Sequence, residues 1–358
     1  MANSGSPQCP FTTPGMVLHS EAFVGRVNEI KFIISRLQDN HQPASVTIVG
    51  DRQSGKSSLL YHIYQTYHIH IRGHQVDRFL VIYVSLQDAN CRTQADFYQT
   101  IARETLKQPQ IHKFPNLEAS LQGDIPDAGA FSKVLEVWKT EGVILVVCLD
   151  DFENFLDRPK EFDKDFYDSL RNLISLKGLM LIIASRKLLL VYSKKKKITS
   201  DFFNVTADCP LKDLTDEEVM ALVQLPKNGL PALRENYRSL AREWGGKNPC
   251  LLQIAARCLW EAQEHNRTVD WAKRQFDNKV RGVPRKFHLF KLFYESIASL
   301  GDLTQELGDM VDRVGSFGKG LVVIVLLIFA LTGLVTINSQ QVPGWFFRSP
   351  EEPKATPK

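Results

Sequence analysis

A glycine-rich turn that follows an apolar run is the feature that most constrains the fold of this chain. The β-branched residues 46–49 end at Gly50, and the pattern Gly-x4-Gly-Lys-Ser closes with Gly55, Lys56 and Ser57. Glycines let successive backbone N–H groups turn toward a triphosphate, and a helix that follows aims its positive end at the same anion. This order of strand, turn and helix predicts a phosphate-binding loop.

Individual side chains of the loop have expected roles in binding the nucleotide. We expect Lys56 to reach the β- and γ-phosphates of ATP and the Ser57 hydroxyl to hold Mg²⁺. The cofactors predicted from this stretch are therefore ATP and Mg²⁺. The residues expected to contact the nucleotide here are Gly50, Ser54, Gly55, Lys56, Ser57 and Ser58.

A second apolar run ends in carboxylates. Residues 143–149 are aliphatic or cysteine and lead to Asp150 and Asp151, with Glu153 two residues further on. The carboxyl ends of parallel strands meet at one edge of a sheet, where the phosphate loop also lies. We therefore expect Asp150 to be a metal partner, through water. Either Asp151 or Glu153 is expected to orient or deprotonate the attacking water.

Strand-length apolar runs alternate with helical patterns up to residue 212. The runs at 79–86 and 178–184 are continuous enough for strands buried on both faces, and a further strand is predicted at 202–206. This alternation predicts an α/β fold, a P-loop NTPase parallel sheet flanked by helices, over residues 21–212.

Beyond residue 212 the alternation ends and helical segments follow one another. Residues 215–218 form a helix start of the capping type, and Gly-Gly-Lys-Asn-Pro at 245–249 separates two further helical segments. We expect residues 213–300 to form a small all-α lid domain, and residues 301–319 to form a juxtamembrane connector.

An uncharged apolar stretch, residues 320–337, follows the connector. As a helix it would span about 27 Å, enough to cross a bilayer with slight thinning. The alternative, a buried core helix, is rarely this long without a polar face. We therefore expect one C-terminal transmembrane helix, with disordered residues 1–20 and 338–358 at the chain ends.

Because ATP is cytosolic and cations flank the near side of the span, the prediction is a single-pass membrane protein with its ATPase domain in the cytoplasm.

The amino-acid composition excludes few function classes. A net charge of +4 argues against a dedicated polyanion binder, and the six cysteines form no C-x-x-C pair, which indicates reduced thiols. The lysine run 194–197 is most simply a solvated loop, and binding of anionic lipid or nucleic acid is the alternative.

Five short motifs together resemble a known family. Phe-Val-Gly-Arg-Val-Asn-Glu at 23–29, the phosphate loop, Leu-Asp-Asp-Phe-Glu at 149–153, Ala-Ser-Arg at 184–186 and Gly-Gly-x-x-Pro occur in one order. In that order they resemble the signal-transducing ATPases with numerous domains (STAND), which are similar to archaeal-type and origin-recognition-type AAA+ ATPases. The resemblance covers residues 23–264.

The resemblance implies roles for three further residues. A helix after residue 26 would pack across the base, with Val24 or Arg26 near the adenine, and the alternative is an ordinary capping helix. The family pattern implies that Arg26 lies near the base. It also implies that Arg186 is the sensor arginine at the γ-phosphate and that Pro249 of the lid contacts the adenine. The catalytic set is then Asp151, Glu153 and Arg186.

The chain departs from the pattern at two points. Asp151 stands where hydrolytic AAA+ members carry glutamate, and no arginine finger is evident after the lid. We therefore expect a membrane-anchored ATP-binding protein, a slow ATPase that acts as a nucleotide-dependent signalling switch through a protein partner or self-association. The alternatives are an AAA+ ATPase associated with nucleic acid and a membrane scaffold that binds ATP without hydrolysing it.

Overall fold

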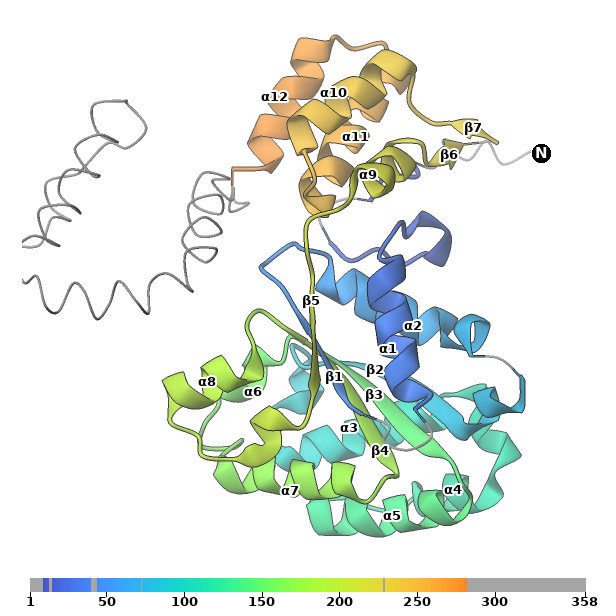
Figure 1. Cartoon of the computed structure of the whole chain (residues 1–358), viewed down its shortest axis with the longest axis vertical. Coiled ribbons are helices and arrows are strands. Elements are labelled where there is room, and N and C mark those ends of the chain that lie inside the picture. Colours follow the sequence, from blue (N-terminus) through green and yellow to red (C-terminus); the bar gives the residue numbers. More distant parts are fainter. Residues whose placement is uncertain (1–8, 13–14, 40–43, 72, 228, 282–358) are drawn as a thin grey trace, which may run out of the picture. The chain divides into compact units, whose positions relative to one another are not determined.

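A five-stranded parallel sheet forms the centre of the described chain (Figure 1). The strands lie in the order β2-β3-β4-β1-β5, and every neighbouring pair is parallel, so all five carboxyl ends meet at one edge. Their bounds are β1 (Val46–Val49), β2 (Phe79–Ser85), β3 (Ile144–Asp150), β4 (Leu179–Ser185) and β5 (Ala207–Pro210). This computed structural model describes residues 9–12, 15–39, 44–71, 73–227 and 229–281.

Helices cover both faces of the sheet (Figure 1). Alternate residues of a strand point to opposite faces, and in β3 Leu145 and Val147 pack with one set of helices while Val146 and Cys148 pack with the other. The first set is α3 (Gln94–Leu106), α5 (Ala128–Thr140) and α7 (Lys164–Ser175), and the second is α1 (Val27–Leu37) and α2 (Lys56–His70). The predicted parallel sheet flanked by helices is thus confirmed.

Side-chain caps fix where these helices begin. Thr93 accepts the N–H of Asp96 in a capping box, and Asp127 and Asp163 cap α5 and α7. Such caps satisfy backbone donors that have no partner inside the helix. The shorter helices of the core are α4 (Pro115–Ser120), α6 (Glu153–Leu156) and α8 (Leu189–Lys196).

Within the described residues, four helices and a short hairpin follow the sheet. The helices share an apolar core to which Leu252 and Leu259 contribute, and Gly245 is needed where α10 meets α11, because a Cβ there would lie 2.4 Å from the Leu252 Cα. The elements of this lid are α9 (Asp216–Val223), β6 (Pro226–Lys227), β7 (Leu230–Pro231), α10 (Glu235–Gly245), α11 (Pro249–Glu264) and α12 (Val269–Lys279).

Three local predictions are wrong. The fifth strand is Ala207–Pro210 rather than 202–206, because Phe202 and Phe203 are buried against the ring of Tyr167 in a 3₁₀ turn. The lysine run is not a loop, since its first three residues complete α8. Within the N-terminal stretch predicted to be disordered, Phe11 is fully buried in the lid core.

The predicted C-terminal elements lie outside the described residues. These are the end of the lid from residue 282, the connector 301–319, the transmembrane helix 320–337 and the tail 338–358. Among the residues that are described, no helix has the length and apolar character needed to cross a membrane.

Candidate functional site

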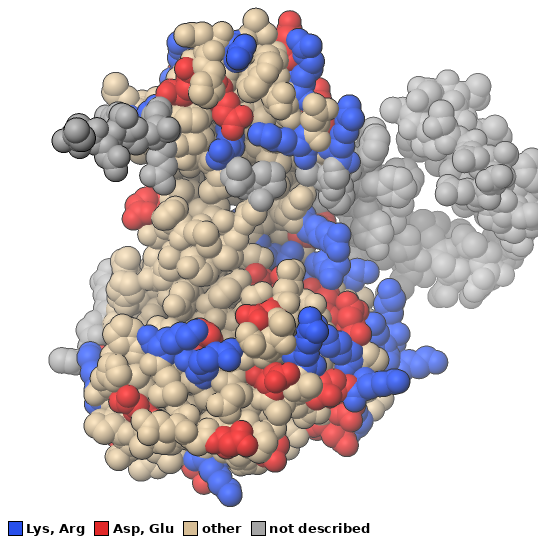
Figure 2. Space-filling model, turned by 180° about the vertical axis from the view of Figure 1, so that it is seen from behind, with Lys and Arg blue, Asp and Glu red and all other residues tan. Residues whose placement is uncertain are grey.

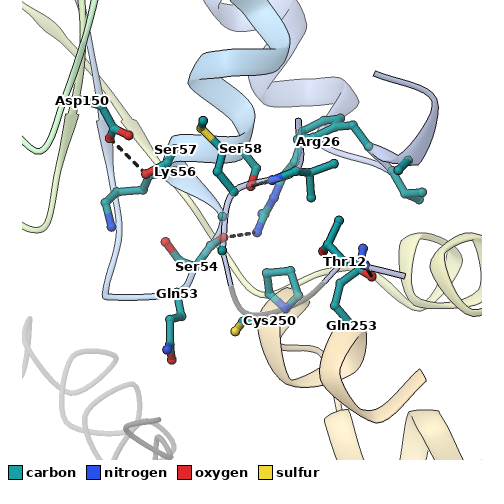
Figure 3. A pocket seen from close by; sticks show the side chains of 18 of the residues that line it. Thr12, Arg26, Gln53, Ser54, Lys56, Ser57, Ser58, Asp150, Cys250 and Gln253 are labelled. Atoms are coloured by element: carbon teal, nitrogen blue, oxygen red, sulfur yellow. Dashed lines mark hydrogen bonds between the residues drawn. The ribbon is translucent and has the colours of Figure 1, made fainter. Parts of the chain in front are cut away.

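A pocket of about 600 Å³ lies where the phosphate loop, the strand ends and the lid meet (Figure 3). This volume lies within the usual range for small-molecule sites. Among the predicted site residues, Gly50, Glu153 and Arg186 do not belong to its lining. Those that do line it are Arg26, Ser54, Gly55, Lys56, Ser57, Ser58, Asp150, Asp151 and Pro249.

The phosphate loop leaves β1 and enters α2 through glycine. Gly55 has a φ of +92° as the residue before α2, a conformation that side chains other than glycine rarely adopt. Gly50 is required for a different reason, since a Cβ there would lie 2.5 Å from the Ser54 Oγ. That Ser54 hydroxyl is buried and has no hydrogen-bond partner among the described residues. The loop therefore keeps an unused polar group beside the pocket.

Lys56 supplies a partly desolvated cation to the pocket. Its Nζ donates to the Asp51 carbonyl at 2.8 Å, across the loop. Burial lowers the pKa of Lys56 below its ordinary value, although the carboxylates of Glu153 and Asp150 act in the opposite direction. A cation in this environment is stabilised by a phosphate.

Asp150 and Ser57 converge from the end of β3 and the start of α2. The Ser57 hydroxyl donates to the Asp150 Oδ1 at 3.0 Å (Figure 3), and Asp150 is only 4 % exposed. A carboxylate and a hydroxyl are the hard oxygen ligands that Mg²⁺ prefers, and this metal usually takes its other ligands from water and from the phosphates of its substrate. Among the described residues, no group of three or more His, Cys, Asp or Glu side chains could hold a metal ion.

The two candidate bases have different surroundings. Glu153 is buried, and its Oε1 accepts the N–H of Arg186 at 2.6 Å and the hydroxyl of Tyr192 at 2.7 Å. Burial alone would raise the pKa of Glu153, but these donors outweigh it and the pKa lies below its ordinary value. Asp151 instead lines the pocket and accepts a hydrogen bond from Gln87 at 2.7 Å. The pKa of Asp151 is raised, mainly by burial and to a smaller extent by the charges of the neighbouring carboxylates.

Arg186, the expected sensor arginine, directly follows β4. Its Nε lies 3.4 Å from the Glu153 Oε2, and its side chain is 38 % exposed. The structure thus places Arg186 in an ion pair next to the pocket, outside the lining itself.

Arg26 lines the pocket, but its guanidinium is already engaged with backbone carbonyls. Its Nη1 donates to the Lys212 carbonyl at 2.7 Å and its Nη2 to the Ser54 carbonyl at 3.1 Å (Figure 3). The same Nη1 lies 3.2 Å from the Glu29 Oε1. Arg26 is 4 % exposed, and a buried cation needs such partners. The side chain therefore joins the phosphate loop to the segment that leads into the lid.

The opposite end of the pocket is formed by the lid and the N-terminal segment. Pro249 starts α11, and its Cγ would lie 3.7 Å from a Cβ placed on Gly55, so it covers the phosphate loop. The Thr12 N–H donates to the Gln253 Oε1 at 3.1 Å across the pocket edge. Apolar residues complete this end, namely Ala22, Phe23, Val24, Leu214 and Leu222.

Several lining residues were not predicted from the sequence. Met16 and Val17 belong to a stretch without a motif, and Gln253 gives no signal beyond lying one helical turn after Pro249. Tyr83 could have been found, because it is a polar aromatic residue near the end of a largely apolar strand. Its hydroxyl donates to the Asp150 Oδ2 at 2.7 Å.

Solved structures show that the fold is shared with known ATPases. A Walker-type ATPase of Pyrococcus abyssi is similar with a TM-score of 0.57 at 14 % identity, over 79 % of each chain. The ORC2 protein of Aeropyrum pernix, solved as ADPNP–ADP complexes, is similar with a TM-score of 0.52 at 14 % identity, over 78 % of this chain and 72 % of that chain. At this level of identity the similarity concerns the fold. No curated protein sequence matches the chain.

A family match agrees with the motifs and with the site geometry. Residues 17–283 match the family Novel STAND NTPase 1, a range that includes the sheet, the phosphate loop and the described part of the lid. The predicted resemblance to STAND and origin-recognition-type ATPases is confirmed. The chain belongs to the Novel STAND NTPase 1 family.

Proposed function

We propose that this protein binds ATP with Mg²⁺, hydrolyses it slowly and uses the nucleotide state to set the position of its lid. The observation that carries the proposal is the convergence of Lys56, Ser57 and Asp150 in one pocket that Pro249 of the lid also lines. The ADPNP and ADP in the Aeropyrum pernix ORC2 structure support an adenine nucleotide.

Binding rests on the loop and on the two oxygen ligands. The backbone N–H groups at the start of α2 and the cation of Lys56 would hold the phosphates. Ser57 and Asp150 would hold Mg²⁺, which when bound neutralises phosphate charge. Arg26 supports the loop, because it binds the carbonyl of Ser54.

For hydrolysis the geometry favours Asp151 over Glu153. Asp151 lines the pocket and its pKa is raised, which favours proton uptake, whereas the pKa of Glu153 is lowered. Glu153 acts better as a positioning residue, since its carboxylate orders the backbone of Arg186. The short Asp151 side chain is held by Gln87 on a backbone with a φ of +55°, which supports slow turnover.

The lid can report the nucleotide state because it lines the same pocket. Contacts from Pro249 and Gln253 would favour one lid position only while a nucleotide is present, and a ligand shifts a conformational equilibrium through such differential contacts. A protein partner, or a second copy of the chain, would then read the lid position. A pull-down of the full chain with ATP and with ADP tests this step, since equal recovery of partners in both states contradicts a switch.

We also propose that residues 320–337 anchor the protein in a membrane, with the nucleotide domain in the cytoplasm. The support is the uncharged apolar sequence of this stretch and its flanking cations. Protease added to sealed right-side-out vesicles is expected to trim only residues beyond 337. Release of the whole protein by carbonate would contradict the anchor, and loss of the nucleotide domain would contradict the orientation.

The ATPase proposal is tested by measuring binding and phosphate release on the same preparation. We expect Mg²⁺-dependent binding of ATP and slow phosphate release in the wild type. The matched variants are Asp150→Asn, which removes the metal partner, and Asp157→Asn, which changes an exposed acid outside the pocket lining. ATP binding without any phosphate release would identify a non-hydrolysing scaffold. Absence of binding would contradict the proposal.

A further inference from the structure

Tyr83 contacts the metal-site aspartate from the neighbouring strand. In the register of β2 and β3, Tyr83 pairs with Cys148 and Ser85 pairs with Asp150, so the side chains of Tyr83 and Asp150 lie on the same face of the sheet. The tyrosine side chain is long enough to reach along this face, and its hydroxyl donates to the Asp150 Oδ2 at 2.7 Å.

The contact completes a set of donors around one carboxylate. The Asp150 Oδ1 accepts the hydroxyl of Ser57 and the backbone N–H of Asp151, each at 3.0 Å. Tyr83 is the donor to the other oxygen, Oδ2. The orientation of the carboxylate plane is therefore fixed from both sides.

The ring of Tyr83 is itself held in place. It packs edge-on against Tyr61 of α2, with ring centroids 5.2 Å apart, and lies 6.2 Å from the ring of Tyr64. Its hydroxyl also lies 3.6 Å from the Met16 sulfur.

We propose that Tyr83 is a positioning residue for Mg²⁺, which it supports by orienting the Asp150 carboxylate through Oδ2. The inference rests on the proposed nucleotide function. The Ser57 hydroxyl can bind the metal through an oxygen lone pair and still donate its hydrogen to Oδ1, whereas the Tyr83 hydroxyl is the side-chain donor that holds Oδ2. Without the phenol hydroxyl, Oδ2 loses its side-chain donor and the carboxylate can rotate away from Ser57.

The test compares Tyr83→Phe with Tyr61→Phe in the full chain. Tyr61→Phe removes a hydroxyl from the adjacent ring and serves as the matched control. Binding of a fluorescent ATP analogue is titrated with Mg²⁺ and, separately, is measured in EDTA. For Tyr83→Phe we expect the Mg²⁺ concentration at half-saturation to rise about tenfold, the size expected for loss of a hydrogen bond to a charged group. Affinity in EDTA should remain that of the wild type.

The possible outcomes separate this inference from the proposed function. Equal Mg²⁺ dependence in the two variants overturns the role of Tyr83. An equal loss of affinity with and without Mg²⁺ also overturns it, because that pattern indicates a structural effect alone. Tighter Mg²⁺ binding by Tyr83→Phe would show that the phenol obstructs the metal, which again contradicts the proposal. If the wild type itself shows no Mg²⁺-dependent binding, the proposed function fails first.

A measurement on the wild type covers the case in which Tyr83→Phe does not fold. With ¹³C-labelled tyrosine, the Tyr83 ring resonance reports on the phenol hydrogen bond. We expect that bond to persist when Mg²⁺ and ADP are added. Its loss on addition would contradict the proposal.

Discussion

The Glu218 carboxylate joins the lid to the core through the backbone of Arg26. Its Oε1 accepts the Arg26 N–H at 2.5 Å, while its Oε2 accepts the Thr215 N–H at 2.8 Å and closes the capping box of α9. A Cβ on Gly25 would lie 2.6 Å from the Glu218 Oε1, so the glycine leaves room for this contact. Because Arg26 also holds the carbonyl of Ser54, one carboxylate connects the start of the lid with the phosphate loop.

Glu218→Ala is expected to lower stability and to weaken nucleotide binding. It removes a helix cap and a partly buried contact with the core, which together should cost about 1–3 kcal/mol in the free energy of unfolding. Nucleotide affinity should also fall severalfold, because Arg26 no longer supports the loop in one position. Urea unfolding and ATP titration measure the two effects.

Glu217→Ala is the control for this prediction. It removes the same charge from the same helix turn, but Glu217 is fully exposed. An effect of Glu217→Ala equal to that of Glu218→Ala would show that only the charge near the helix N-terminus matters.

Phe11→Ala is expected to destabilise the lid. Phe11 is fully buried in the lid core, and Arg257 donates to its carbonyl at 3.1 Å. Truncation of a fully buried phenylalanine typically costs about 3–5 kcal/mol. Hydrogen exchange should accelerate in α11, while the sheet should remain protected.

Thr12→Ala serves as the control, since Thr12 binds Gln253 through its backbone N–H and not through its side chain. An unchanged unfolding curve for Phe11→Ala would show that the N-terminal segment is not part of the folded lid.

Asp151→Asn and Glu153→Gln are expected to separate hydrolysis from stability. Asp151→Asn should leave ATP binding intact and lower phosphate release by about 100-fold or more, the usual contribution of a general base. Glu153→Gln should chiefly lower stability, because the buried Glu153 carboxylate accepts the Arg186 N–H and the Tyr192 hydroxyl and pairs with the Arg186 side chain. Wild-type turnover by Asp151→Asn would contradict the assignment of the base.

The stability effect of Glu153→Gln should depend on pH. Because the pKa of Glu153 is lower in the folded than in the unfolded protein, the unfolded state binds the proton more tightly. The stabilisation by this carboxylate is therefore fully present above the ordinary value of 4.5 and is lost as the pH falls through the folded pKa. Wild type and variant should differ in urea unfolding at pH 7 and converge in acid. A constant difference across this range would show that the charge of Glu153 is not involved.

The sequence predicts the parts of the site that follow from local motifs and from the common edge at which parallel strands end. The glycine spacing before Lys56 and the acid at the end of an aliphatic run suffice to place Ser57 beside Asp150, because local geometry and parallel strand order determine this contact. The capping box of α9 is local in the same way. These features require no knowledge of distant packing.

Contacts between distant segments could not be predicted in this way. Nothing near Phe11 indicates that it belongs to the lid more than 200 residues later, and the partner of Tyr83 depends on the strand register. Arg26 illustrates a different limit, because its motif indicates a place near the pocket but not that its guanidinium binds carbonyls. The predicted position of the fifth strand is wrong because two adjacent phenylalanines suit a strand as well as a buried turn.

Even the overall charge gives little information about the site. On the face shown in Figure 2, Lys and Arg side chains are interspersed with Asp and Glu. This pattern agrees with the small net charge of +4.

Titration of the full chain with ATP in the presence of Mg²⁺, by calorimetry, tests the nucleotide site most directly. Lys56→Ala should weaken binding at least tenfold, which corresponds to about 1.4 kcal/mol. Arg52→Ala, which removes an exposed cation of the same loop outside the pocket lining, should bind ATP as the wild type does. Equal ATP affinity for Lys56→Ala and the wild type would contradict the assignment of this pocket as the nucleotide site.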